Sequence, residues 1–173
     1  MIDETAPCTP VNNYGRSKWM GERAVLEANP NALVLRLNFF GWGPKYRPSF
    51  SDWIINSLSN KAEISLYENV YFTPLYVGDV IRSAHELMAQ KAQGIYHLTS
   101  NDRLSKYDFG MKLAKAFELD VRLISSDQYN TEKGVPRPLD MSLDNTKIRK
   151  ALNGNNFKID DAITALKNNK SLI

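Results

Sequence analysis

Short apolar runs alternate with segments of helical periodicity along the chain, and this alternation restricts the fold more than any other feature. Residues 32–38 (ALVLRLN) hold five apolar residues out of seven and no turn former, which is typical of a strand buried on both faces of a parallel sheet. Strands that alternate with helices favour an α/β fold with parallel pairing. Further strands are predicted over residues 64–67, 94–99 and 121–124. Helices are predicted over residues 13–29, 50–58, 79–89, 106–117, 144–152 and 160–168, with Ser105 as the N-cap of the fourth.

No glycine-rich phosphate-binding turn is visible in the sequence. A dinucleotide-binding fold opens with a strand, a Gly-x-Gly-x-x-Gly turn and a helix whose N-terminus holds the pyrophosphate. The nearest match, Gly41-Trp-Gly43, is followed by Pro44 and opens no long amphipathic helix. We therefore interpret it as a tight turn.

One pair of residues has the spacing that acid–base chemistry needs. Tyr14 and Lys18 are four residues apart in a predicted helix, so their side chains share one face. A phenol titrates at about pH 10, and a neighbouring ammonium stabilises its phenolate form. The same spacing occurs at Tyr129 and Lys133, but that stretch is polar and followed by Gly134, which predicts a solvated loop.

The residues around Tyr14 distinguish it from this duplicate. Residues 10–22 (PVNNYGRSKWMGE) resemble the active-site helix of the extended short-chain dehydrogenase/reductase family, and most closely its dTDP-4-dehydrorhamnose reductase-like members. Four further regions are similar to that family: the strand and its exit at residues 33–41, the segments at residues 72–80 and 94–99, and the RPLDMSLD stretch that begins at Arg137.

This resemblance implies a fold. It predicts that residues 1–173 are a single unit, the C-terminal portion of a Rossmann-like doubly wound parallel sheet together with a small substrate-binding subdomain. The N-terminal dinucleotide-binding part, roughly 110–130 residues on the family pattern, is then absent from this chain. We expect the isolated chain to be inactive without it, and to associate as a homo-oligomer through the apolar surface that its loss exposes.

The resemblance also implies a function and a set of site residues. The expected activity is NAD- or NADP-dependent reduction of a nucleotide-linked 4-keto sugar, with Tyr14 as general acid and base assisted by Lys18. Tyr14, Lys18, Asn38 and Phe39 would bind the cofactor, and Asn38, Phe39 and Arg137 the substrate. Phe39 stands where the reductases commonly carry tryptophan. Two alternatives remain open: a sugar-nucleotide epimerase or dehydratase portion, and a non-catalytic protein-binding module derived from the family.

Composition excludes several other classes of partner. The 22 Lys and Arg residues are scattered and the net charge is only +3, so no nucleic-acid-binding surface is expected. A single cysteine, Cys8, and two histidines are too few for a disulfide or a typical zinc site. No apolar run approaches the roughly 18 residues of a membrane span. We therefore expect a cytoplasmic protein without a metal site.

Overall fold

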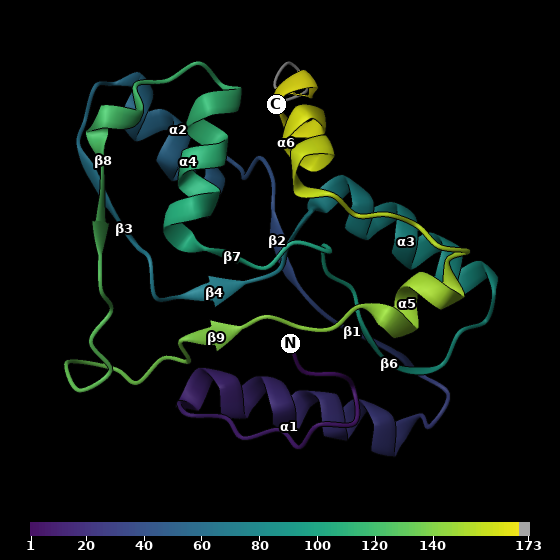
Figure 1. The fold of residues 1–173 in the computed structure, drawn as a ribbon. Coiled ribbons are helices and arrows are strands. Elements are labelled where there is room, and N and C mark those ends of the chain that lie inside the picture. The colour runs from purple at the N-terminus through teal and green to yellow at the C-terminus, as the bar shows by residue number, and fades with distance from the viewer. Residues whose placement is uncertain (170–173) are drawn as a thin grey trace.

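Parallel strand pairs form the centre of the molecule, and the computed structural model describes residues 1–169 of it. Strand β1 (Leu33–Arg36) pairs with β6 (Gly94–His97), and the chain then continues into β2 (Asn38–Phe40), which changes partner to β5 (Pro74–Tyr76). Both pairs are parallel, and β1, β2 and β6 lie near the middle of the view in Figure 1. The predicted α/β fold with a doubly wound parallel sheet is confirmed.

A second group of strands forms the small subdomain. Strand β3 (Ile64–Tyr67) pairs in parallel with β8 (Ile124–Asp127). Strand β4 (Tyr71–Phe72) lies between β7 (Leu104–Ser105), which is antiparallel to it, and β9 (Asp140–Met141), which is parallel. These short strands bring segments that are far apart in the sequence to one side of the molecule (Figure 1).

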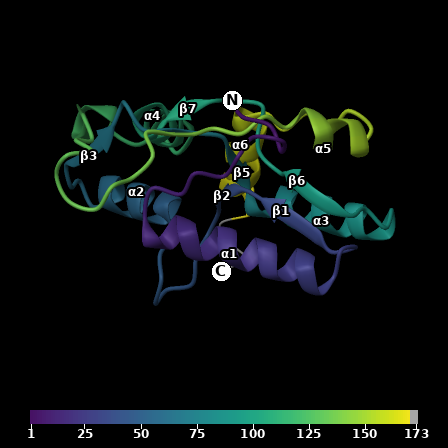
Figure 2. The ribbon, with the colours of Figure 1, turned by 90° about the horizontal axis from the view of Figure 1, so that it is seen from below.

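Six α-helices connect and cover the strands in the described part of the chain. Helix α1 runs across β1 and β2 on one face, as the view in Figure 2 shows. No helix within residues 1–169 combines the length and the apolar character needed to cross a bilayer. The helices are α1 (Asn13–Ala28), α2 (Phe50–Ser59), α3 (Val77–Ala89), α4 (Lys106–Ala116), α5 (Thr146–Ala151) and α6 (Ile159–Asn168).

Two strand predictions need correction. Residues 32–38 are not one strand buried on both faces, because β1 ends at Arg36, β2 begins at Asn38, and all four residues of β1 are only half-buried. The physical reason is that β1 has a single strand neighbour, β6, within the described residues. The strand predicted over residues 121–124 begins only at Ile124. A 3-10 helix over Val121–Leu123 precedes it, and the Asp120 side chain caps this helix by accepting from the backbone N–H of Arg122 (3.0 Å).

The larger hydrophobic core lies between α2, α4, α6 and β3. Its central side chain is Phe109 of α4, which is fully buried. Phe109 contacts three other aromatic rings, with centroid distances of 5.1 Å to Phe40, 5.4 Å to Phe72 and 6.0 Å to Phe50. The core thus holds strands β2 and β4 against helices α2 and α4.

Candidate functional site

A single asparagine fixes the start of α1. The side-chain oxygen of Asn12 accepts a hydrogen bond from the backbone N–H of Gly15 (2.8 Å), and its amide nitrogen donates to the carbonyl oxygen of Pro136 (2.8 Å). Asn12 therefore caps α1 and ties it to the loop that carries Arg137. Gly15 lets the preceding loop fold back closely, because a Cβ atom there would lie 3.3 Å from Cβ of Pro10.

Tyr14 and Lys18 lie on the exposed side of the first turns of α1, as the i, i+4 spacing predicts. The Tyr14 side chain is 73% exposed, and the Lys18 ammonium lies 5.4 Å from the centroid of its ring. The duplicate pair differs, because Tyr129 and Lys133 lie in a loop after β8. There the Tyr129 hydroxyl donates to the carbonyl oxygen of Val135 (2.7 Å).

A cleft of about 1090 Å³ opens beside the N-terminal end of α1. Its volume is slightly above the range that small-molecule sites usually span, roughly 300–1,000 Å³. Aromatic rings line much of it: Phe50 and Trp53 of α2 stack at 6.0 Å with an interplanar angle of 16°, and Tyr67 meets Tyr129 edge-on at 5.3 Å.

The predicted site residues are only partly brought together in this cleft. Tyr14 and Arg137 both line it, whereas Lys18, Asn38 and Phe39 lie outside its lining. Asn38 is half-buried, and its amide nitrogen donates to the carbonyl oxygen of Met141 (3.1 Å), which does line the cleft. Phe39 is 64% exposed, so its ring is open to solvent on β2.

Helix α1 is attached to the sheet through a polar cluster. Arg36 of β1 donates two hydrogen bonds to the Glu22 carboxylate, at 2.6 and 2.8 Å, and a third to Sγ of Cys8 (3.1 Å). The hydrogen bond to Glu22 raises the pKa of Arg36 above its ordinary value. His97 lies next to Arg36 and is fully buried, and this burial lowers its pKa.

We expect Glu22→Gln to lower the free energy of unfolding by about 1–3 kcal/mol, because it leaves a half-buried guanidinium without its counter-charge. Urea denaturation followed by circular dichroism measures this change. Glu27→Gln, at an exposed position of the same helix, is the matched control and should stay within about 0.5 kcal/mol of the original protein. Equal stability of the two variants would contradict this account of how α1 is attached.

Sequence reasoning did not single out Lys106, one of the charged residues that line the cleft. It is the first residue of α4, and its side chain lines the cleft between two phenylalanine rings. The signal in the sequence is a lysine directly after the N-cap Ser105, because the first turn of a helix favours acidic rather than basic side chains.

Comparison with protein-family models assigns the chain to a family. The family model described as the RmlD substrate binding domain matches residues 1–170. The chain belongs to the RmlD substrate-binding-domain family. Its relation to the extended short-chain dehydrogenase/reductases, predicted from residues 10–22, is thereby confirmed.

Two curated relatives are similar to this family member at about 30% identity. The "probable low-salt glycan biosynthesis reductase Agl14" of Haloferax volcanii is 31% identical over 95% of the chain and 55% of its own length. The "methionine adenosyltransferase 2 subunit beta" of Xenopus laevis is 30% identical over 82% of the chain and 44% of its own length. The chain spans about half the length of the curated relatives it matches.

Solved structures share the fold of the RmlD family member at lower identity. The dTDP-4-dehydrorhamnose reductase from Bacillus anthracis, determined in complex with NADP, superposes with a TM-score of 0.86 at 22% identity. It covers 98% of this chain, which in turn covers 59% of that structure. The enzyme ortholog from Clostridium acetobutylicum gives a TM-score of 0.84, also at 22% identity.

Proposed function

We propose that this chain supplies the substrate side and the acid–base residues of an NAD(P)-dependent reductase that acts on a nucleotide-linked keto sugar. The observation that carries the proposal is the position of Tyr14. Its hydroxyl-bearing ring lines a large cleft together with Arg137, and Lys18 lies one turn further along the same helix. The similarity to a glycan biosynthesis reductase supports the same class of reaction.

In the proposed reaction Tyr14 is the general acid. Negative charge develops on the ketone oxygen of the sugar during reduction, and the Tyr14 hydroxyl donates its proton to that oxygen. The Lys18 ammonium stabilises the phenolate that this transfer leaves. Arg137, whose guanidinium carries paired N–H donors, binds phosphate oxygens of the substrate.

The residues present fit the nicotinamide end of a dinucleotide. Lys18 offers ammonium donors for a ribose diol, and the 64% exposed ring of Phe39 offers a free apolar surface beside Asn38. NAD(P)H, when bound, supplies the hydride. We propose that Tyr14, Lys18, Asn38 and Phe39 hold this end, and that the pyrophosphate is bound by a dinucleotide-binding part encoded upstream in the same protein.

The test is hydride transfer by the protein extended to its natural start. Oxidation of NADPH at 340 nm should depend on a dTDP-linked 4-keto sugar, whereas the 173-residue chain alone should show no turnover. Turnover of a 4-hydroxy sugar nucleotide with NAD⁺, with inversion at C4 of the sugar, would instead identify the protein as an epimerase. Absence of any sugar-nucleotide turnover in the extended protein would refute the proposal.

A non-catalytic role is the second candidate, and one observation favours it. The chain is 30% identical to a protein named as the beta subunit of a methionine adenosyltransferase. In that case the fold would serve as a protein-binding module, and no sugar nucleotide would be turned over. A stable complex with a catalytic partner subunit, isolated from the native source, would be its positive evidence.

We also propose that the chain self-associates. Helix α1 has no buried residue, and its exposed side chains include Met20 (57% exposed) and Val25 (49% exposed). Exposed apolar surface of this kind is usually covered by association. We expect light scattering to give a mass above 19.7 kDa, and Met20→Lys to shift it toward the monomer. A monodisperse monomer at high concentration would contradict this expectation.

A further inference from the structure

Lys106 occupies an unusual position for a lysine. Its backbone N–H donates to the carbonyl oxygen of Val70 (2.9 Å), which places it where β7 turns into α4. Its ammonium lies 3.3 Å from the ring centroid of Phe72 and 4.8 Å from that of Phe50. The side chain therefore lies against two aromatic rings and lines the cleft.

The charge of this ammonium is not balanced inside the protein. Within residues 1–169 no carboxylate forms an ion pair or hydrogen bond with it; the nearby Asp108 is engaged in capping α4 through Ser105. The positive end of the helix dipole also disfavours a cation in the first turn. Burial lowers the pKa of Lys106 to about 8. The two ring faces attract the ammonium, but neither supplies a negative charge to pair with it, so the cation is available to an anionic ligand in the cleft.

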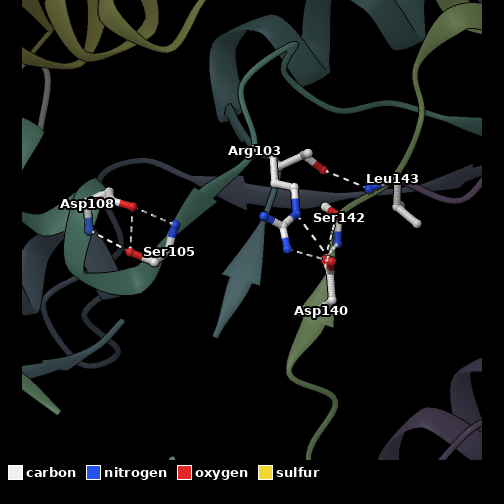
Figure 3. A network of polar contacts seen from close by, with 7 residues as sticks. Arg103, Ser105, Asp108, Asp140, Ser142 and Leu143 are labelled. Carbon is white, nitrogen blue, oxygen red and sulfur yellow. Dashed lines mark hydrogen bonds and ion pairs between the residues drawn. The ribbon is translucent and has the colours of Figure 1, made fainter. Parts of the chain in front are cut away.

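The backbone on both sides of Lys106 is held in place by hydrogen bonds, which Figure 3 shows. The carboxylate of Asp108 and the hydroxyl of Ser105 form a reciprocal cap, with distances of 2.7–3.2 Å. Arg103 binds the Asp140 carboxylate at 2.8 Å, and the same carboxylate accepts from Ser142. These bonds link β7 to β9 and fix the start of α4, so the backbone that carries Lys106 is held in position.

The chemistry of the cleft indicates what Lys106 would bind. Two cations line it, Lys106 from α4 and Arg137 from the loop tied to α1, against one carboxylate, Asp127. The stacked rings of Phe50 and Trp53 offer an apolar wall suited to a planar ring. A ligand with a flat ring and more than one negative charge matches this combination.

We propose that Lys106 is a substrate-binding residue that binds the diphosphate of a nucleotide-linked ligand, as a second cation of the cleft in addition to Arg137. This inference rests on the proposed function and deepens it, because it assigns phosphate recognition to a residue of the small subdomain. The negatively charged diphosphate supplies the counter-charge that the Lys106 ammonium lacks within residues 1–169.

The direct test is calorimetric titration of the full 173-residue chain with thymidine diphosphate and with thymidine. We expect the diphosphate to bind more tightly than the nucleoside, and Lys106→Met to weaken diphosphate binding by about tenfold or more, which is about 1.4 kcal/mol. Thymidine binding should not change. Lys106→Arg should retain most of the diphosphate affinity. Lys115→Met, at an exposed position of the same helix, should bind the diphosphate as tightly as the original protein.

The pH dependence gives a readout that a purely structural lysine would not move. The free ammonium loses its proton as the pH rises through about 8, so diphosphate affinity should fall between pH 7.5 and 9.5, where the terminal phosphate is already fully ionised. In Lys106→Arg this fall should be absent, because a guanidinium does not titrate there. The other titratable groups around the cleft are Tyr14, Tyr67, Tyr129, Asp127 and Arg137, and they are common to both proteins.

The stability of Lys106→Met separates a ligand role from a packing role. Removing an unbalanced, largely buried charge should leave the melting temperature unchanged or raise it, whereas a lysine kept for packing would lower it. The inference is overturned if Lys106→Met binds the diphosphate as tightly as the original chain, or if the original chain does not prefer diphosphate over nucleoside. The proposed function would survive either result, because hydride transfer by the extended protein tests it separately.

Discussion

Tyr14→Phe is expected to reduce sugar-nucleotide turnover by the extended protein by about 10²–10⁴-fold, the usual contribution of a positioned general acid. The substitution removes only the hydroxyl that would protonate the ketone oxygen. Because the Tyr14 side chain is 73% exposed and α1 has no buried residue, stability should stay within about 0.5 kcal/mol of the original protein. Steady-state oxidation of NADPH measures the change.

The matched control for this prediction is Tyr46→Phe. Tyr46 is 89% exposed and does not line the cleft, so its loss of a hydroxyl should leave turnover unchanged. A binding titration with the sugar nucleotide should show similar affinity for Tyr14→Phe and the original protein, which assigns the loss to the chemical step. Normal turnover by Tyr14→Phe would remove Tyr14 from the catalytic role.

Phe109→Ala is expected to lower the free energy of unfolding by about 3–5 kcal/mol, the usual cost of emptying a large aromatic site in a core. Phe109 is fully buried and meets the rings of Phe40, Phe50 and Phe72, so the cavity would lie between two helices and two strands that cannot all close over it. Urea denaturation measures the loss, and the dependence of the unfolding free energy on urea concentration should stay unchanged. Phe39→Ala, which truncates a 64% exposed ring, should change stability by less than about 0.5 kcal/mol.

The Phe109 variant has a second expected result, since Phe50 and Phe72 also enclose the Lys106 ammonium. Loosening these two rings should weaken diphosphate binding even under conditions where the variant remains folded. Unaltered binding together with the full loss of stability would show that the core and the cleft are independent of each other.

Helices with local capping signals could be predicted from the sequence almost to the residue. Helix α1 begins at Asn13 as expected because Asn12 caps it, and Ser105 caps α4 as predicted, with Asp108 completing the capping box. Such signals lie within a few residues of the helix end, so no tertiary information is needed to read them.

Strand limits depended on partners that the sequence does not specify. The run over residues 32–38 contains no local break, yet pairing divides it at Leu37, because β1 adjoins β6 while β2 adjoins β5. The burial of its two faces could not be predicted either, because an apolar composition does not show how many strands lie next to it.

The candidate site could be predicted only where a family motif marks it. Tyr14 and Lys18 belong to such a motif, and the structure gives both the expected place on α1. Lys106 belongs to no motif, and in the sequence it is one of 22 basic residues. Its distinguishing properties, enclosure by two rings and the lack of a counter-charge, arise from tertiary packing alone.

The two hydrogen bonds of Asn12 have a consequence for the order of events during synthesis. One of them joins positions 124 residues apart, and Ile2 likewise bridges to Leu143 near the other end of the chain. Until the ribosome has released Pro136, the start of α1 lacks this long-range hydrogen bond. Contacts of such long sequence separation form late and slow folding. The tyrosine-bearing helix, although among the earliest segments of this chain to be made, therefore acquires its final position only after the loop around Pro136 has emerged.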